Sequence, residues 1–394
     1  MGKYILVTGG ELFNKGAQAM TFITVSEMAK RYPDKKVVLM SARDYQRSRD
    51  EKKKYCFEFI SYPNLKTQLL SPILKNIKYK KGNTINREFL KILKETDAII
   101  DISGYALGSN WGSDKAISYM MKIIVGYFNR IPVYLMPQSF GPFEFDGKKG
   151  KIANVLIKIF LPKAKCVMAR ENVAKELIDK KYPKTHTIKT YDLVLQNKEI
   201  NIETVFRKKI SLINLEISKG SVALIPNSKA ITYSSEEKAY FEYKCFVDSI
   251  LKNQKKVYLI YHAVEDYTIC KRLKIMYYKS NSNVVVVNEE LNCLDFDKNV
   301  KKFDFIVGSR FHSIVHAYKN SIPAIVLGWA VKYRELMEIF GQERYQFDSK
   351  NINSEMDIQK AVDTMCENYI QESIKIKTKL QIVQKDNVFD KVKI

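Results

Sequence analysis

Short apolar runs alternate with helix-length segments along almost the whole chain, and this pattern restricts the fold more than any other feature of the sequence. In the first half, strand-like runs occupy residues 4–8, 36–40, 98–102, 132–136 and 166–169. In the second half, they occupy residues 210–215, 222–225, 257–261, 284–287, 305–307 and 324–327. Strands that alternate with helices form parallel sheets with right-handed crossovers. The sequence therefore predicts an α/β protein.

The length of the chain predicts more than one domain. It has 394 residues, whereas single hydrophobic cores stop growing at roughly 250 to 300 residues. We expect a Rossmann-like N-terminal domain over 1–200, a Rossmann-like C-terminal domain over 209–345, and a helical tail over 346–394 that packs back on the rest. Ligands of such sheets bind beyond the carboxyl ends of the strands, so a central cleft between the domains is the predicted site.

The chain is strongly basic, since 66 Lys and Arg against 43 Asp and Glu give a formal net charge of +23. Such a charge suits an anionic partner. The lysine-rich runs 51–55, 78–82 and 148–151 are spread out, and aromatic residues are not interleaved with them as stacking platforms for bases would be. We therefore expect no nucleic-acid partner. A solvated lysine-rich surface and a peripheral contact with an anionic membrane both stay open.

Cysteine usage and hydropathy predict the compartment. The six cysteines form no CxxC pair, which is typical of reduced thiols in a cytoplasmic protein. A strand close to the N-terminus predicts that there is no signal peptide. No run approaches the ~18 consecutive apolar residues of a transmembrane helix. We therefore expect a cytoplasmic protein, for which any membrane contact would be peripheral and at the inner face of the membrane.

Residues 304–336 combine a strand, a tight turn and a helix start. A short apolar run leads into Gly308 and Ser309, and an apolar-periodic helix begins with Arg310 and His312. Unpaired backbone N–H groups and the positive end of the helix dipole make such a turn an anion site. Arg310 adds a partner for a carboxylate or phosphate, and His312 adds a group for proton transfer. The segment therefore predicts chemistry on a small anionic donor.

Four further residues of the second half lie at or near strand ends. Asn227 and Lys229 follow one strand, and Lys332 lies in the helix that follows another. His262 comes directly after a third strand, where a ligand contact and a structural role are both open. Because the carboxyl ends of parallel strands meet at one edge of a sheet, we expect all four to face the same site.

A metal site is not expected. His312 and His316 lie one helical turn apart, which is a spacing that metal ligands use. No third ligand with zinc spacing follows, and there is no HEXXH motif. We therefore interpret His316 as a packing residue and His312 alone as functional.

Polar strand-end loops of the first half supply a second group of candidates. Amide, hydroxyl and charged side chains in such loops suit sugar hydroxyls or a phosphate, although structural turns or plain connectors fit the first two loops as well. The glycines of the first loop lack the GxGxxG spacing of a dinucleotide site, so no cofactor is expected. The candidate residues are Asn14, Lys15, Asp101, Ser103, Gly104, Gln138 and Ser139.

These segments, in this order, resemble the polysaccharide pyruvyl transferase family. The resemblance rests on NKGAQAM near the start, the glycine loop after DIS, PQSFGPF, ARE and, above all, VGSRFHS followed by SIPAIVLGW and KYREL, and it covers nearly all of residues 3–345. It implies two Rossmann-like domains in a GT-B-like arrangement. It also implies transfer of pyruvate from phosphoenolpyruvate to two hydroxyls of a sugar, which forms a cyclic ketal.

The resemblance also implies roles for the candidate residues. The Arg and His of the family's R-x-H motif fall on Arg310, which would hold the donor, and on His312, which would act as general acid. The second-half candidates would lie on the donor side: Ser309, Asn227, Lys229, His262 and Lys332. The first-half loops would bind a saccharide acceptor, which we expect to be a cell-surface polysaccharide or its lipid-linked precursor. The alternative is a GT-B glycosyltransferase that uses a nucleotide-sugar donor.

Overall fold

The computed structural model describes residues 2–76, 83–233, 235–350 and 353–394. The lysine-rich run 78–82 lies outside the described residues. The chain forms two compact units. Unit 1 comprises Met1–Leu12, Met20–Ile210 and Asn387–Ile394, and unit 2 comprises Phe13–Ala19 and Ser211–Asp386. Among the described residues, no helix is both long and apolar enough to cross a membrane.

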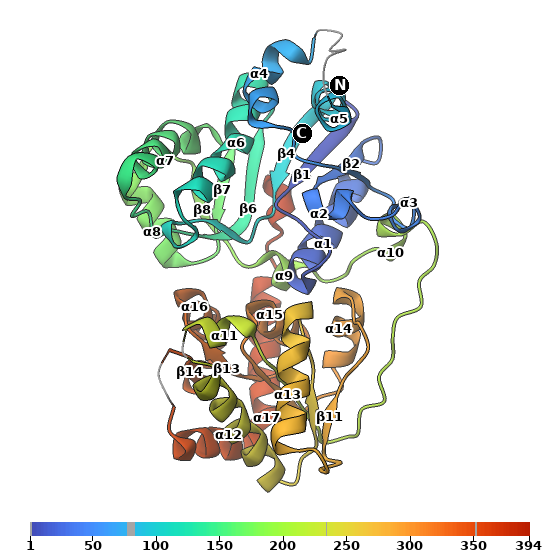
Figure 1. Ribbon diagram of the computed structural model, residues 1–394, viewed down its shortest axis with the longest axis vertical. Coiled ribbons are helices and arrows are strands. Elements are labelled where there is room, and N and C mark those ends of the chain that lie inside the picture. The colour runs from blue at the N-terminus through green and yellow to red at the C-terminus, as the bar shows by residue number, and fades with distance from the viewer. Residues whose placement is uncertain (1, 77–82, 234, 351–352) are drawn as a thin grey trace. The chain divides into compact units, whose positions relative to one another are not determined.

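Unit 1 contains a parallel sheet with the strand order β3-β2-β1-β4-β6-β7-β8, and β5 pairs with β6 (Figure 1). Because β1 lies between β2 and β4, the strand order reverses at β1, as in a Rossmann-like fold. All residues of β6 are buried, so helices cover both faces of the sheet there. The strands are β1 Tyr4–Thr8, β2 Lys36–Met40, β3 Glu58–Ile60, β4 Thr96–Asp101, β5 Tyr105–Leu107, β6 Val133–Phe140, β7 Cys166–Ala169 and β8 Thr187–Lys189.

The helices between these strands bury the apolar residues of the sheet. Helix α1 starts among residues of unit 2 and continues into unit 1. The helices of this part of the chain are α1 Lys15–Arg31, α2 Ala42–Tyr45, α3 Arg49–Lys52, α4 Leu65–Leu74, α5 Thr84–Lys94, α6 Ser113–Asn129, α7 Gly147–Phe160, α8 Asn172–Lys181, α9 Leu193–Gln196 and α10 Ile202–Val205.

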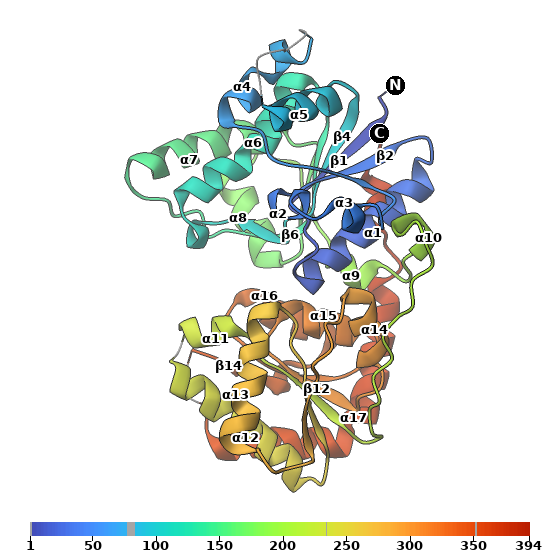
Figure 2. The ribbon, with the colours of Figure 1, turned by 45° about the vertical axis from the view of Figure 1, so that its right-hand side comes forward.

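Unit 2 contains a second parallel sheet with the order β11-β10-β9-β12-β13-β14. Every residue of β9, β12 and β13 is buried, so helices cover both faces of this sheet as well (Figure 2). The strands are β9 Val222–Ile225, β10 Val257–Leu259, β11 Val284–Val286, β12 Phe305–Gly308, β13 Ala324–Gly328 and β14 Gln346–Asp348. The helices are α11 Ser228–Tyr233, α12 Glu236–Lys252, α13 Tyr267–Tyr277, α14 Cys293–Val300, α15 Phe311–Lys319, α16 Val331–Phe340 and α17 Glu355–Val383.

One predicted strand is wrong, and side chains explain why. The apolar run 210–215 forms no strand. The backbone N–H groups of Ile213 and Leu215 donate to Asp295 Oδ1 at 2.8 Å and to Asn299 Oδ1 at 2.9 Å, both in α14. Side-chain oxygens therefore satisfy the backbone donors that a neighbouring strand would otherwise have satisfied.

The last part of the chain divides between the units. Helix α17 packs against α12, α15 and α16 within unit 2. The end of the chain belongs to unit 1, where Tyr134 Oη donates to the carbonyl of Lys393 at 2.6 Å and Arg31 pairs with Asp390 at 2.7 Å. Phe389 is 2% exposed, so this segment contributes apolar core as well as polar contacts.

We expect Phe389→Ala to lower the free energy of unfolding by about 3 kcal/mol, because truncating a buried Phe leaves a cavity. Asp390→Ala is the control, since the side chain of Asp390 is 64% exposed and exposed ion pairs contribute about 1 kcal/mol or less. Urea unfolding followed by circular dichroism measures both values. Equal, small losses would show that the end of the chain does not stabilise unit 1.

Candidate active site

The turn between β12 and α15 has the geometry that the sequence predicted. β12 ends at Gly308, Arg310 is the N-cap residue, and α15 begins at Phe311. The carbonyl of Ser309 accepts hydrogen bonds from Asn227 Nδ2 and from Tyr333 Oη, both at 2.9 Å. The side chains of Ser309 and Asn227 are buried. They hold the turn that presents Arg310.

Arg310 forms a buried ion pair with Asp266. Its Nε lies 2.7 Å from Asp266 Oδ2 and its Nη2 lies 2.6 Å from Asp266 Oδ1. Glu265 and Ser228 also accept from Nη2, at 3.0 and 3.2 Å. Burial opposes the charge of Arg310, but the interactions with Asp266 and Glu265 outweigh burial and raise the pKa of the guanidinium. Arg310 therefore stays cationic.

Asp266 is the N-cap residue of α13. Its carboxylate accepts from the backbone N–H of Ser228 at 2.9 Å and of Ala263 at 3.1 Å, besides Arg310. One carboxylate thus connects the segments that follow β9, β10 and β12. The hydrogen bonds of Arg310 to the described residues use Nε and Nη2.

His312 lies directly against the first turn of α1. A Cβ atom added to Gly16 would be 2.3 Å from both Cγ and Nδ1 of His312, so only glycine allows this approach. Asn14 Oδ1 accepts from the N–H of Gly16 at 2.9 Å and fixes the start of α1. The His312 side chain is half-buried. The sequence offered no sign that these two segments would meet.

We expected Lys15 on the acceptor side, in the N-terminal domain. In the structure it belongs to unit 2. Its Nζ donates to the carbonyls of Tyr261 at 3.2 Å and His262 at 3.0 Å, and Asn14 forms a β-bridge with Ala263. These contacts with the segment after β10 explain why Phe13–Ala19 groups with unit 2. Burial lowers the pKa of Lys15 to about 8, although Asp266 and Glu290 oppose this shift.

His262 lies in the core, as in the structural role that the sequence left open for it. Its ring packs 5.3 Å from the ring of Phe296 and 6.3 Å from that of His316. Among the described residues, neither ring nitrogen has a hydrogen-bond partner. Burial lowers the pKa of His262 well below its ordinary value, so the ring is neutral and adds no charge to the site. His316 is also buried, and its Nδ1 lies 2.9 Å from Asp297 Oδ1.

The two remaining lysine candidates of unit 2 lie in different places. Lys332 is in the first turn of α16, with its Nζ 5.0 Å from the ring centre of Phe311. It therefore lies close to the start of α15. Lys229 is exposed in α11, directly after Ser228, which accepts from Arg310. The starts of α1, α15 and α16 thus carry Lys15, Arg310, His312 and Lys332. Lys229 is exposed at the edge of this group of residues.

In unit 1, Asp101 at the end of β4 is the centre of a polar network. Oδ1 accepts from Lys122 Nζ at 2.6 Å, Ser103 Oγ at 2.7 Å and Thr8 Oγ1 at 3.1 Å. Oδ2 accepts from Tyr119 Oη at 2.9 Å and also from the side chain of Gln138 at 3.3 Å. Asp101 and Gln138 are fully buried. The sequence identified Asp101, Ser103 and Gln138, and the structure brings all three together.

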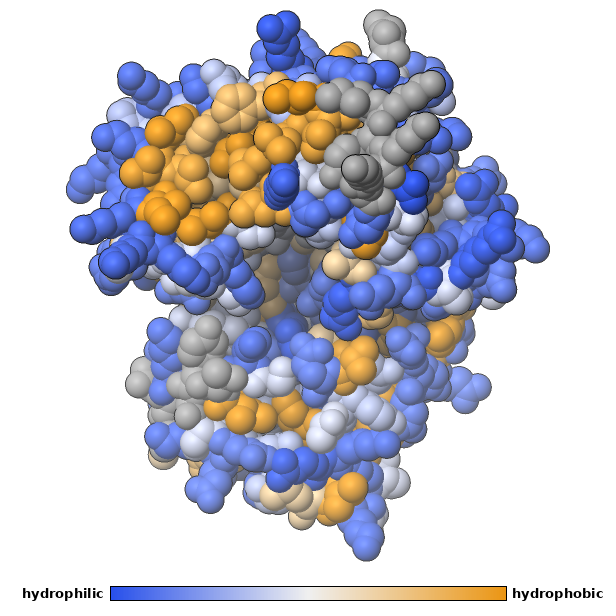
Figure 3. All heavy atoms as spheres, turned by 45° about the horizontal axis from the view of Figure 1, so that its top comes forward, coloured by the Kyte–Doolittle hydropathy of each residue, from blue (hydrophilic) through white to orange (hydrophobic). Residues whose placement is uncertain are grey.

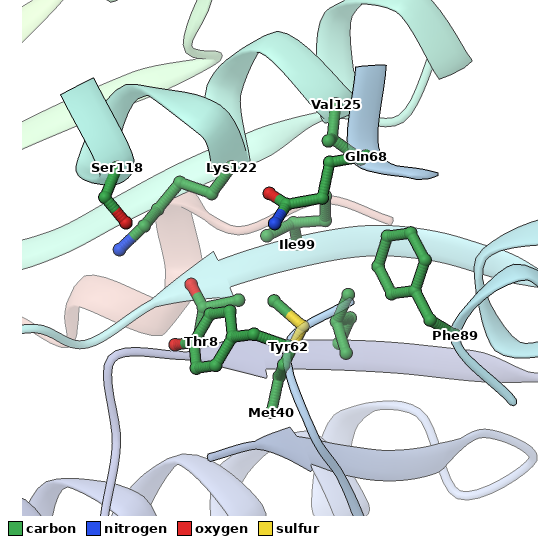
Figure 4. A pocket seen from close by; sticks show the side chains of 10 residues that line it. Thr8, Met40, Tyr62, Gln68, Phe89, Ile99, Ser118, Lys122 and Val125 are labelled. Atoms are coloured by element: carbon green, nitrogen blue, oxygen red, sulfur yellow. The ribbon is translucent and has the colours of Figure 1, made fainter. Parts of the chain in front are cut away.

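A pocket lies beside this network, and it contains residues that sequence reasoning missed. Figure 4 shows Ser118 and Lys122 of α6 pointing toward Thr8, with Tyr62 and Gln68 nearby. One signal could have identified Lys122. It is the only charged residue in the apolar run 117–129, where a solvated lysine has little reason to occur.

Ser139 lies in a separate buried cluster, whereas Gly104 shapes a loop. Ser139 Oγ donates to Glu171 Oε1 at 2.7 Å and accepts from Arg170, which also pairs with Asp192 at 3.0 Å. Ser139 is thus bound to internal partners, which corrects its expected exposure to a ligand. Glu171 is the N-cap residue of α8, where its negative charge suits the positive end of the helix dipole. Gly104 has φ +67°, which lets its carbonyl accept from the N–H of Ser139.

Comparisons with known proteins agree with the fold and with the resemblance. A family model described as polysaccharide pyruvyl transferase matches residues 14–330. No curated protein sequence matches the chain. Within the described part of the chain, no cluster of His, Cys, Asp and Glu is arranged to hold a metal ion.

Solved structures share the fold at low identity. HepE from Anabaena, in complex with UDP and glucose, is 11% identical, with 97% of this chain and 95% of that chain covered and a TM-score of 0.54. UDP-GlcNAc 2-epimerase from Methanocaldococcus jannaschii is 12% identical, with 92% of each chain covered and a TM-score of 0.56. MnaA from S. aureus, solved with UDP, is 11% identical over 98% of this chain and 93% of that chain, with a TM-score of 0.56. The predicted α/β fold of the GT-B class is confirmed.

We expect the amine of Lys15 to titrate at about pH 8. Reductive ¹³C-methylation followed by NMR measures this value, and Lys15→Arg assigns the resonance. Since the native state releases this proton before the unfolded chain does, the free energy of unfolding rises as the pH increases from about 8 toward 10.5. Lys15→Met loses that dependence. A midpoint near 10.5 would contradict the buried position.

Proposed function

This chain belongs to the polysaccharide pyruvyl transferase family, and we propose that it transfers pyruvate from phosphoenolpyruvate to a sugar of a cell-surface polysaccharide or its precursor. The product is a pyruvate ketal that bridges two hydroxyls of the sugar. The observation that carries the proposal is the start of α15, where Arg310 and His312 occupy the R-x-H positions. Metal and cofactor have no role in this proposal.

Phosphoenolpyruvate carries about three negative charges on a small molecule, so its site needs several cations and helix N-termini together. Unit 2 supplies this combination. Helix α15 begins beside Arg310, α1 begins at Lys15, and α16 begins beside Lys332. Lys15 is cationic below about pH 8. We assign the donor to these helix starts, with Lys229 at the border and with Ser309, Asn227 and His262 supporting the site from the core.

His312 acts as the general acid in the proposed reaction. It donates a proton to the methylene carbon of the enol phosphate, which leaves a cation-like centre at the adjacent carbon. One sugar hydroxyl attacks that carbon and gives its proton to the now neutral His312. The C–O bond to the phosphate then breaks, and inorganic phosphate leaves with the bridging oxygen. The second hydroxyl attacks the same carbon and closes the ketal, and its proton goes to the departing phosphate. Bound anions favour the protonated imidazole before the first step.

The acceptor sugar is assigned to the pocket of unit 1. Lys122, Ser118, Tyr62 and Gln68 line this pocket and offer a cation, a hydroxyl, a phenol and an amide. Such groups recognise sugar hydroxyls. The buried residues of the network, Asp101 above all, hold Lys122 in place and do not contact the sugar themselves. Ser103, Gly104 and Gln138 shape the same region.

A GT-B glycosyltransferase with a nucleotide-sugar donor is the second candidate. The start of α15 suits a diphosphate as well as a phosphate, because both bind at helix N-termini. The two candidates differ in their donor. Incubation of the chain with phosphoenolpyruvate and saccharide acceptors gives inorganic phosphate and a mass gain equal to a pyruvate ketal if our proposal holds. Activity with UDP-sugars alone would replace it by the glycosyltransferase function.

We expect His312→Ala to lower the rate of pyruvyl transfer by roughly 10²- to 10⁴-fold, because general acid catalysis contributes that much. Phosphate release with phosphoenolpyruvate and acceptor measures the rate. His186→Ala is the control, since His186 is exposed in unit 1. A His312→Ala enzyme that keeps the wild-type rate would remove His312 from the mechanism.

Ser118→Trp tests the acceptor pocket. Ser118 is exposed at the pocket, and the hydrogen bonds to Asp101 come from other described residues, so an indole there fills the pocket without removing a bond of the network. We expect the KM for the acceptor to rise roughly tenfold or more, while the KM for phosphoenolpyruvate stays unchanged. Ser118→Ala, which leaves the pocket open, is the matched control. A change in the donor KM alone would move the acceptor elsewhere.

We propose that the acceptor is lipid-linked and that the enzyme works at the inner face of the membrane. The net charge of +23 supports this, because anionic lipids attract polybasic proteins.

A further inference from the structure

Helix α4 exposes four of its apolar residues and buries two polar ones. Thr67 and Ser71 are buried, and Ser71 Oγ accepts a hydrogen bond from Asn129 Nδ2 of α6 at 2.8 Å. A helix on the surface of a globular protein shows the opposite pattern, with its apolar stripe toward the core. The outward residues of α4 are Leu65, Leu69, Leu70 and Ile73.

Helix α7 is apolar toward the core and toward the solvent. Ala153 and Ile157 are buried in unit 1. Ile152, Val155 and Ile159 are each about half exposed, at 52%, 54% and 50%. Their spacing of three and four residues places them in one row on the helix surface. Packing in the core explains why Ala153 and Ile157 are apolar, but it does not explain the three exposed side chains.

Helix α6 joins these two surfaces. It packs against α4 on one side and against α7 on the other. Tyr127 and Phe128 at its end are exposed, and their rings lie 6.1 and 6.0 Å from the ring of Phe160 in α7. We call the exposed apolar side chains of α4, α6 and α7 the apolar face. Figure 3 shows it as a broad hydrophobic area with hydrophilic side chains around it. Apolar patches of this kind mark binding surfaces.

The charged side chains of α4 and α7 are all cationic, because neither helix contains an acidic residue. Acidic groups occur at the edge, where Asp114 of α6 pairs with Lys149 at 2.8 Å and Asp146 precedes α7. Protein–protein interfaces are depleted in lysine relative to the rest of the surface, so this border favours a lipid surface over a protein partner. An apolar centre with a lysine border matches a bilayer that has anionic headgroups and an acyl interior. The exposed lysines of α7 and the segment after it are Lys148, Lys149, Lys151, Lys158, Lys163 and Lys165.

We propose that the apolar face docks unit 1 onto an anionic membrane surface. The leucine, isoleucine and aromatic side chains enter the boundary between headgroups and acyl chains, and the lysines stay at the level of the lipid phosphates. Membrane docking does not depend on the reaction that the chain catalyses. The proposal names the anionic partner that the net charge of +23 predicts, and it names the face of the protein that meets this partner.

The position of the acceptor pocket gives this surface a use, and this step alone rests on the proposed function. Gln68 of α4 lines the pocket, and its neighbour Leu69 is part of the apolar face. One helix thus contributes to both. A lipid-linked saccharide can keep its lipid in the bilayer while its sugar reaches the pocket.

Co-sedimentation of the full chain with vesicles tests the docking surface without any substrate, so its result is independent of the proposed reaction. We expect binding to vesicles of equal parts phosphatidylcholine and phosphatidylglycerol, and weaker binding to phosphatidylcholine alone. Ile73→Glu with Ile159→Glu should lower binding about tenfold or more, and Lys151→Glu with Lys158→Glu should remove the preference for the anionic lipid.

The matched control is Ile275→Glu with Ile374→Glu in unit 2, where the two side chains are 65% and 61% exposed, compared with 62% and 50% for Ile73 and Ile159. This control should bind as the wild type does. A separate Ile159→Trp variant keeps the site apolar and the fold intact. The emission of Trp at position 159 is the difference between the spectra of this variant and the wild type. On vesicle binding, this emission should shift to the blue and be quenched by brominated lipid.

Two results would overturn the proposal. One is equal vesicle binding by the Ile73/Ile159 variant and the Ile275/Ile374 control, together with an unshifted fluorescence signal from the Ile159→Trp variant. The other is a dimer in lipid-free solution that the Ile73/Ile159 variant dissociates, since a second copy of the chain would then cover the apolar face. Analytical ultracentrifugation measures the second outcome.

Discussion

The buried ion pair between Arg310 and Asp266 is the interaction on which the proposed donor site depends. It joins the segments after β9, β10 and β12, because Asp266 also accepts from the backbone of Ser228 and Ala263. A buried carboxylate without its cation is strongly destabilising, so neither partner can be lost without moving the loops. The pair therefore fixes the position of the α15 start, and through it the position of His312 against Gly16.

Unit 1 uses the same physical device in its own sheet. Asp101 ends β4 next to β1, where the strand order reverses, and Lys122 neutralises it as Arg310 neutralises Asp266. In each unit a buried carboxylate and one cation organise the polar groups at the carboxyl ends of parallel strands. Ligands of open α/β sheets bind at this position because the strand order leaves a crevice there. Each unit thus places a buried carboxylate and a cation at the carboxyl ends of its parallel strands, with Asp101 and Lys122 in unit 1 and Asp266 and Arg310 in unit 2.

Local patterns predicted what depends on local structure. The turn at Gly308 followed by Arg310 and His312 is a strand–turn–helix element, and its chemistry could be read from adjacent residues. The conformation of residues 210–215 could not be predicted in this way. It depends on Asp295 and Asn299, which lie about 80 residues later and accept hydrogen bonds from the backbone of this segment. Lys122 was missed because a lone lysine in an apolar helix has meaning only when its carboxylate partner is known.

The sequence by itself determined the parallel α/β architecture, the family, and the segment that carries Arg310 and His312, because each depends on periodicity or on neighbouring residues. Only the tertiary structure decided that Lys15 and Gly16 belong with the second half of the chain, that His262 is buried and neutral, and that α4 shows its leucines to the outside. Those outcomes depend on contacts between residues far apart in the chain, and periodicity says which side of a helix is apolar but not what that side will meet.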